Sequence, residues 1–165
     1  MTVVSNTGPI VALAKADHLS LLRILYGDVL IPPAVHRELL AKVGPEAERI
    51  DDGLAGFLRI TPISRPPEEV DRLTSGLGAG EQQAICLVLE TAGLLLMDDR
   101  AGRKAAGQLG IATTGVVGVL LKAKQDGHLP MVGPVLEIIR SQGYWLSDAV
   151  VGTAMRLADE SSSRA

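Results

Sequence analysis

Side chains that carry oxygen follow two short apolar segments of the chain, and such side chains could hold a metal ion. Asn6 follows Val3–Ser5, while Asp98 and Asp99 follow the leucine-rich segment at 94–97. Carboxylate and carboxamide oxygens favour hard divalent ions such as Mg²⁺ and Mn²⁺. Acids gathered in one place would repel one another unless a cation lay among them. The pattern therefore predicts metal binding, with these residues as candidate ligands.

Two glutamates lean toward the inward side of predicted helices and could join them. In PPAVHRELLAK the buried stripe should hold Val35 and Leu39. Glu38 stands at the border of that stripe, about 60° from Val35 at roughly 100° per residue. In GEQQAICLVLE, Glu81 continues the face of the buried stripe one turn earlier. The four acids together predict an anionic cluster that would take Mg²⁺ or Mn²⁺.

Each of these residues, taken singly, also has a structural interpretation. Asn6 and the two aspartates can start turns, and Asp99 is placed to cap a helix that begins near Arg100. Glu81 would complement the dipole of its helix from the first turn, and Glu38 could be a partly exposed surface residue. These alternatives remain open at the level of the sequence.

Strand-like and helix-like segments alternate along the chain. Strands are predicted at Val3–Ser5, Val29–Ile31, Leu58–Ile63, Leu94–Met97 and Ile111–Thr113, with Tyr144–Leu146 as a short edge strand. Helices are predicted at Pro9–Leu25 with a break near Asp17, Pro33–Lys42, Glu46–Phe57, Pro67–Leu73, Gly80–Thr91, Arg100–Leu109, Val116–Lys124, Val132–Arg140 and Asp148–Ala158. This alternation predicts an α/β fold, a three-layer α/β/α sandwich around a central, mainly parallel sheet of about five strands.

The predicted sheet places the candidate ligands where such folds bind their ligands. In an open parallel sheet, ligands bind outside the carboxyl ends of the strands, which is where Asn6, Asp98 and Asp99 stand. We expect one domain at 1–160 and a disordered tail at 161–165. Apolar residues bunched in Val132–Ile139 suit either a subunit interface or core packing.

Composition limits the function classes. The chain has 165 residues with 47% hydrophobic and 21% charged content, which suits one globular domain, and no apolar run reaches the ~18 residues of a membrane span. One cysteine excludes an internal disulfide, and the absence of a targeting signal at the start predicts a cytoplasmic protein. The net charge of −3 provides no basic footprint for nucleic acid. With 2% aromatic residues, base stacking is not expected to drive recognition.

Five segments in order carry a resemblance to a known family. They are VVSNTGPIVALAK, VLIPPAVHREL, LGAGEQQAICLVLE, LLLMDDRAGRKAAGQLG and GVVGVLLKAKQDG. Together they resemble the PIN-domain superfamily, and more closely a branch of bacterial and archaeal proteins related to VapC-type toxins of toxin–antitoxin pairs. The resemblance covers about residues 3 to 160. It implies a nuclease that binds one or two Mg²⁺ or Mn²⁺ ions at four acidic positions and cleaves single-stranded RNA.

The resemblance assigns the four acidic positions to Asn6, Glu38, Glu81 and Asp99, with Asp98 as a neighbour or substitute. Most of the superfamily has an aspartate where this chain has Asn6. An amide oxygen can coordinate a hard cation but brings no charge. We therefore expect weakened catalysis, a single-metal site, or complete loss of activity.

If the protein is active, the resemblance implies metal-assisted hydrolysis of a phosphodiester bond. Thr7 matches the small hydroxyl residue that follows the first acidic position. Arg100, Arg103 and Lys104 could contact substrate phosphates, with Lys15 as a weaker candidate, although a solvated helix face explains the basic residues of the 100–109 helix equally well.

Two hypotheses follow for the function. The first is a metal-dependent ribonuclease, the toxin of a toxin–antitoxin pair, held in check by a small cognate antitoxin and forming a homodimer. The second is a catalytically impaired PIN fold that binds RNA or a protein partner. Asn6 is the residue that separates them.

Overall fold

A five-stranded parallel sheet forms the centre of the molecule. The computed structural model describes residues 1–161, and its strands are β1 (Val3–Ser5), β2 (Val29–Ile31), β3 (Leu58–Ile60), β4 (Leu94–Leu96) and β5 (Thr113–Thr114). Their order in the sheet is β3-β2-β1-β4-β5, and all neighbouring pairs are parallel. The predicted α/β fold is confirmed, and β1 and β4 lie side by side at its centre.

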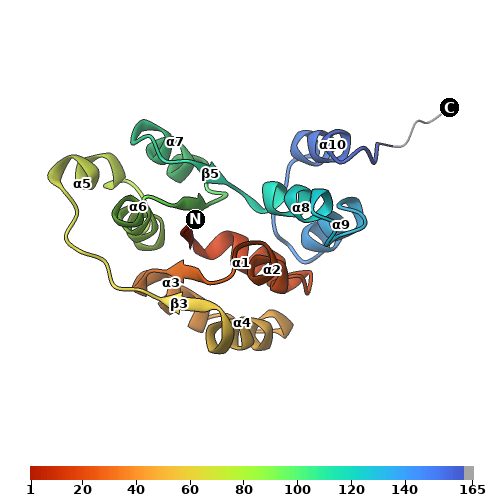
Figure 1. Cartoon of the computed structure of the whole chain (residues 1–165), viewed down its shortest axis with the longest axis horizontal. Helices are drawn as coiled ribbons and strands as arrows, with labels where there is room; N and C mark the ends of the chain where they lie inside the picture. The colour runs from red at the N-terminus through yellow and green to blue at the C-terminus, as the bar shows by residue number, and fades with distance from the viewer. Residues whose placement is uncertain (162–165) are drawn as a thin grey trace.

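Helices pack on both faces of this sheet (Figure 1). They are α1 (Thr7–Lys15), α2 (Ser20–Tyr26), α3 (Pro33–Leu40), α4 (Pro45–Gly56), α5 (Glu68–Thr74), α6 (Ala79–Thr91), α7 (Arg100–Gln108), α8 (Val116–Gln125), α9 (Gly133–Ser141) and α10 (Asp148–Leu157). In Figure 1, α5, α6 and α7 lie to one side of the strands, and α1, α2, α8, α9 and α10 lie to the other. This is the predicted three-layer sandwich.

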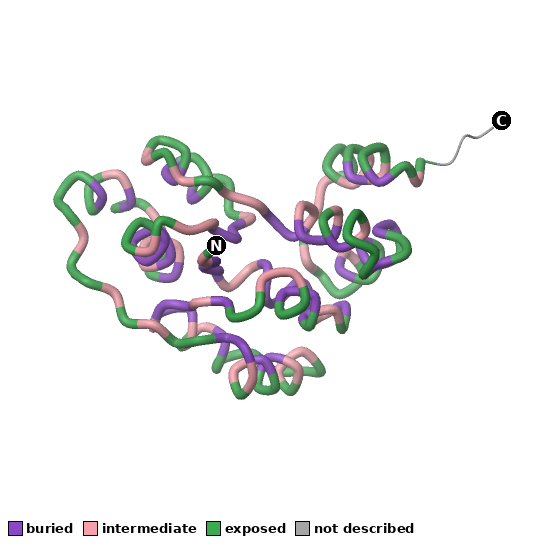
Figure 2. Tube along the Cα trace, viewed as in Figure 1, coloured by how far each residue is buried: buried purple, intermediate pink, exposed green. Residues whose placement is uncertain are grey.

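The strands alternate their side chains between two apolar cores. Val3 and Leu96 belong to the larger cluster, whereas Val4, Leu95 and Met97 belong to the smaller one under α5, α6 and α7. Successive residues of a strand point to opposite faces, so short uniformly apolar strands are what a sheet covered on both sides requires. Figure 2 shows the buried positions gathered around the strands and the inward faces of the helices.

Most predicted elements are confirmed to within a few residues. The break near Asp17 separates α1 from α2, and Asp17 has a positive φ of 56°. The third strand is shorter than predicted and ends at Ile60, since Pro62 cannot donate to a ladder. The last strand comprises Thr113–Thr114 rather than Ile111–Thr113.

The predicted edge strand at Tyr144–Leu146 is wrong. Its residues alternate as a strand would, with Tyr144 and Leu146 half-buried and Trp145 exposed, but the segment is irregular and belongs to no sheet. Its alternation comes from packing against the larger apolar core, to which Tyr144 and Leu146 both contribute. The side-chain pattern of a strand is therefore present here without a partner for its backbone.

The C-terminal helices are joined by a buried carboxylate. Glu160 accepts hydrogen bonds from the backbone N–H of Val132 at 2.8 Å and of Gly133 at 2.9 Å, and it pairs with Lys124 at 2.9 Å. Burial raises the pKa of this carboxyl, but the two N–H donors and the charge of Lys124 outweigh burial and hold it below its ordinary value. Glu160 thereby fixes the chain after α10 against α8 and α9.

Three further features bear on the sequence predictions. Over residues 1–161, every helix is too short or too polar to cross a bilayer. The predicted disordered tail at 161–165 lies outside the described residues except for residue 161. The apolar residues of 132–139, which suited either a subunit interface or core packing, belong mostly to the core: Val132, Val135, Leu136 and Ile139 are buried, and Ile138 is exposed.

Candidate functional site

An open cleft lies at the carboxyl ends of β1 and β4. Its volume is about 400 Å³, and it is lined by Asn6, Thr7, Gly8, Glu81, Asp98, Asp99, Arg100, Tyr144 and Trp145. The two strands are paired in register, Ser5 opposite Leu96, and the backbone N–H of Asn6 donates to the carbonyl of Leu96 at 3.0 Å. Residues that follow the two strands are therefore delivered to the same place.

Asn6 lies buried at the floor of this cleft, with 4% of its surface exposed. It occupies the N-cap position of α1, yet its side chain makes no capping hydrogen bond. Instead its amide Nδ2 donates to Oε1 of Glu81 at 3.4 Å. Its Oδ1 is buried and has no hydrogen-bond partner within residues 1–161. Such an unsatisfied acceptor costs roughly 1–3 kcal/mol, and within residues 1–161 no side chain or backbone group offsets that cost.

Glu38 of α3 contacts Thr7 next to the cleft. The hydroxyl of Thr7 donates to Oε2 of Glu38, which links the start of α1 to α3. A side chain at Gly80 would place its Cβ only 2.6 Å from Oε1 of Glu38. The glycine therefore allows the carboxylate to lie against the first turn of α6, the turn that carries Glu81. Glu38 itself is absent from the lining of the cleft.

The adjacent acids after β4 have different surroundings. Asp99 is exposed, and its Oδ2 accepts a hydrogen bond from the N–H of Gly102 at 2.7 Å, so the predicted capping role is confirmed. In the described part of the chain, its Oδ1 makes no hydrogen bond. One carboxylate can thus cap α7 through one oxygen and offer the other to the cleft.

Asp98 is half-buried, and both of its oxygens are engaged. It accepts from the N–H of Val116 at 3.1 Å and from the hydroxyl of Tyr144 at 2.7 Å. Burial raises the pKa of the Asp98 carboxyl, while Tyr144, Val116 and the charge of Arg103 lower it in part. Burial and the neighbouring Asp98 raise the pKa of Tyr144, which keeps its phenol protonated as the donor. Asp98 is thereby better suited to joining α8 and Tyr144 to β4 than to binding a cation.

The predicted phosphate-binding residues are distributed unequally. Arg100 is exposed and lines the cleft, whereas Arg103 lines a neighbouring groove beyond Asp98. Lys104 is exposed on α7. Lys15 lies at the far end of α1 from Asn6 and forms an ion pair with Glu46 at 3.0 Å. The structure therefore brings Arg100 to the cleft and leaves Lys15 away from it.

Two lining residues, Tyr144 and Trp145, were missed by reasoning from the sequence. Tyr144 is 46 residues from the aspartate that it contacts, and no local pattern connects them. The sequence offered one signal, its composition, because each aromatic residue is noticeable in a chain that has so few. Both belong to the segment between α9 and α10.

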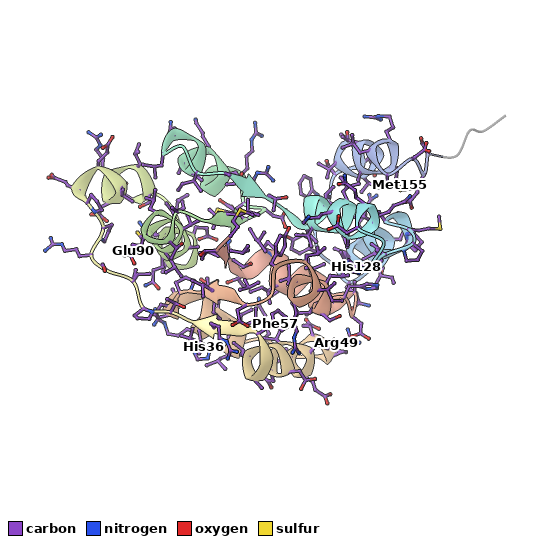
Figure 3. The ribbon with its side chains drawn as sticks, in the orientation of Figure 1. His36, Arg49, Phe57, Glu90, His128 and Met155 are labelled. Atoms are coloured by element: carbon purple, nitrogen blue, oxygen red, sulfur yellow. The ribbon has the colours of Figure 1, made fainter. Side chains whose placement is uncertain are left out.

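The donor set of the cleft consists of oxygens, the ligand type that hard divalent ions prefer. Its candidate ligands are oxygens: the unpartnered Oδ1 of Asn6 and the carboxylates of Glu81 and Asp99. Residues 1–161 contain no three His, Cys, Asp or Glu side chains that are close enough together to hold a metal ion. The amide oxygen of Asn6 would therefore be needed to complete the set. The histidines do not contribute, and His36 and His128 lie well apart in Figure 3.

Comparisons with known proteins agree with this architecture. A family model described as a PIN domain matches residues 2–160, which is nearly the whole chain. A search of curated proteins gives no significant match.

Proposed function

Because the chain belongs to the PIN-domain family, whose members are commonly nucleases, we propose that it is a metal-dependent endoribonuclease that cleaves single-stranded RNA. One observation carries the proposal: Asn6, whose amide oxygen is buried and has no hydrogen-bond partner within residues 1–161, lines an open cleft together with Glu81 and Asp99. A structural role would have satisfied that oxygen within the protein. A ligand site leaves it free.

Asn6, Glu81 and Asp99 would hold Mg²⁺ or Mn²⁺, with Glu38 supporting them through its hydrogen bond with Thr7. When bound, the ion supplies a Lewis acid that activates water and offsets charge that develops on the phosphate. Glu81 also orients Asn6 by accepting its Nδ2 hydrogen bond, which leaves the amide oxygen available to the cation.

Arg100 provides the contact for the RNA backbone. It is the basic side chain that lines the cleft, next to Asp99 at the start of α7. A guanidinium beside the acids offsets their repulsion of the phosphate and fixes the strand without reading its bases. Arg103 and Lys104 extend this positive charge along α7, which compensates locally for the net charge of −3.

The proposed biological role is that of the toxin in a toxin–antitoxin pair in the cytoplasm. An open cleft lined by Glu81 and Asp99, with Arg100 at its rim, suits regulation by a small cognate antitoxin that covers it. Two copies would form a homodimer, with exposed Ile138 of α9 available to the contact. Sedimentation of the purified chain alone, and with the product of an adjacent short reading frame, tests both statements.

The nuclease proposal is tested with Asp99→Asn. Asn is as good an N-cap as Asp, so the variant keeps the hydrogen bond to Gly102 but loses the charge. We expect cleavage of a single-stranded RNA with Mn²⁺ by the wild type, at least a tenfold loss in the variant, and weaker Mn²⁺ binding by calorimetry. Asp51→Asn, an exposed acid on α4, is the matched control and should change neither. Equal activity in Asp99→Asn and wild type would contradict the proposal.

A second function, an RNA- or protein-binding module without turnover, is favoured by one specific contact. Asn6 donates to Glu81, so this pair is stable without a cation, as an acid at position 6 would not be. In that case the wild type should bind RNA, or its protein partner, in the presence of a chelator and release no product with Mn²⁺. Asp99→Asn would then alter neither binding nor turnover.

A further inference from the structure

Trp145 is the only tryptophan of the chain, and 82% of its surface is exposed. It lines the cleft together with Asn6, Asp99 and Arg100. It also lines the adjacent groove, which contains Arg103 and Thr114 and has a volume of about 400 Å³. The largest aromatic side chain in the protein thus stands between a candidate metal site and a second groove, which combines apolar side chains such as Val117 and Leu121 with Asp98, Arg103 and Thr114.

The backbone around Trp145 is held on both sides. Tyr144 is anchored by its hydroxyl to Asp98 at 2.7 Å, and its N–H donates to the carbonyl of Ile139 at 3.2 Å. On the other side, Leu146 packs against the larger core, and the hydroxyl of Ser147 caps α10 by accepting from Val150 at 3.1 Å. The exposed indole is therefore carried on a short segment with fixed neighbours, which reduces the entropy lost when it binds a ligand.

We propose that Trp145 is a stacking platform for an unpaired base of single-stranded RNA, in register with a phosphate held by Arg100. The choice of RNA as the ligand rests on the proposed function. The stacking role rests on the exposed indole and on the cleft and groove on either side of it, each of which combines charged and apolar lining. An aromatic face stacks on any base, and the following phosphate needs a cation within reach, which the rim of the same cleft supplies.

An RNA base fits these surroundings better than an apolar protein side chain does. The cleft beside Trp145 presents three carboxylates, an amide and a guanidinium. The groove beyond it adds Arg103 and the hydroxyl of Thr114 next to apolar side chains such as Val117 and Leu121, so it suits a ligand with an apolar face and polar edges, as a base has. Base edges and phosphates can use such groups, whereas an apolar side chain would desolvate them without replacing their hydrogen bonds. The low aromatic content predicted little stacking, but composition counts residues and does not place them. A single well-placed aromatic is enough for one base.

The test uses the full chain without divalent ions, so that nothing is cleaved and the outcome does not depend on catalysis. The probes are a short oligouridylate, whose bases do not stack on each other strongly, and an abasic oligomer of the same length. Because Trp145 is the sole tryptophan, its emission reports directly on contact with a base. We expect oligouridylate to quench this emission and the abasic oligomer to leave it nearly unchanged.

The affinity of labelled RNA, measured by fluorescence anisotropy, tests the energy of stacking. Trp145→Ala should raise Kd for oligouridylate by about 5- to 100-fold and leave Kd for the abasic oligomer unchanged. Trp145→Phe should recover most of the affinity. Met131→Ala removes a half-exposed apolar side chain from the loop between α8 and α9 and should change neither value.

Two outcomes would overturn the stacking role. If oligouridylate binds without quenching and with the same Kd to wild type and Trp145→Ala, the indole serves a protein contact instead of RNA. If Trp145→Ala weakens both oligomers equally, the residue acts only through the shape of the protein. Quenching without any cleavage in Mn²⁺ would keep this inference and reject the nuclease. Cleavage in Mn²⁺ without quenching would keep the nuclease proposal and reject the stacking role of Trp145.

Discussion

Substitution of Asn6 by Asp is the most informative change in the cleft, because it turns a hydrogen bond into a contact between two negative charges. The amide Nδ2 of Asn6 lies 3.4 Å from Oε1 of Glu81 and donates to it. In Asn6→Asp a carboxylate oxygen takes the place of that donor. Without a cation, the variant loses a hydrogen bond and gains a repulsion. With a cation, both carboxylates become ligands.

The size of the effect follows from the distance. Two unit charges about 4 Å apart interact by about 4 kcal/mol at an effective dielectric constant of 20. Glu81 is half-exposed, so water and salt reduce this repulsion. We therefore expect a loss of about 1–2 kcal/mol in the free energy of unfolding in a chelator. For a domain of this length, that loss corresponds to a fall in Tm of roughly 2–8 °C.

Thermal unfolding in EDTA and in Mn²⁺ measures both sides of this prediction. Mn²⁺ at about 100 times its Kd stabilises the folded state by about 2.7 kcal/mol. It should therefore raise the free energy of unfolding of Asn6→Asp to at least the value that the wild type has in EDTA. The Mn²⁺-induced rise in Tm should be larger in the variant than in the wild type. Asn6→Ala is the control, since it loses the hydrogen bond without adding charge and should gain little from Mn²⁺.

The result that would refute this reasoning is an Asn6→Asp variant as stable as the wild type in EDTA, with the same Mn²⁺-induced rise in Tm. In that case, residue 6 and Glu81 do not share an electrostatic environment. The cleavage assay gives a second measurement: if the neutral amide limits catalysis, Asn6→Asp should cleave RNA faster than wild type.

Three further changes separate stability from ligand binding. Gly80→Ala places its Cβ against the Glu38 carboxylate, which has to move aside, so the Mn²⁺ affinity measured by calorimetry should fall. The free energy of unfolding should stay within about 1 kcal/mol of wild type, because the glutamate side chain is flexible and Ala favours the helix. Glu160→Gln should cost about 1–3 kcal/mol in urea unfolding at neutral pH. Because the pKa of Glu160 is depressed in the folded state, this difference should persist above the ordinary glutamate value and vanish as pH falls through the folded value. Tyr144→Phe removes the 2.7 Å hydrogen bond to Asp98 and should cost roughly 1.5–3 kcal/mol in the same assay.

Much of the fold could be predicted from the sequence because its signals are local. The central strands β1, β2 and β4 are short, mostly apolar runs followed within two residues by Asn, Pro or Asp, and the helices show a repeating buried stripe. The capping role of Asp99 follows from residue type and position alone, and it is confirmed. The placement of Asn6 beside Glu81 was also within reach. A parallel sheet brings its carboxyl ends together, and the helical stripe of α6 shows which way Glu81 faces.

The features that escaped prediction depend on contacts between distant segments. Nothing near Tyr144 indicates that its hydroxyl meets Asp98, because that contact depends on how α9 and α10 pack. The burial of residues 144–146 alternates as it would in a strand, because an extended segment that packs on a core also turns every second side chain inward. For β5, Ile111 packs on the smaller core before the chain joins the sheet, so the apolar run begins earlier than the hydrogen-bonded strand.

The two adjacent aspartates after β4 show how the site and the fold share neighbouring residues. Both carboxylate oxygens of Asp98 accept hydrogen bonds within the protein, which joins the start of α8 and Tyr144 to the sheet. Asp99 caps α7 through Oδ2, and it also lines the cleft. If Asp98 were instead a metal ligand, Tyr144 would lose its anchor whenever the ion bound, and Trp145 would shift with it. With the structural acid separate from the proposed binding acid, the cleft would take up a cation while the indole beside it stayed in place.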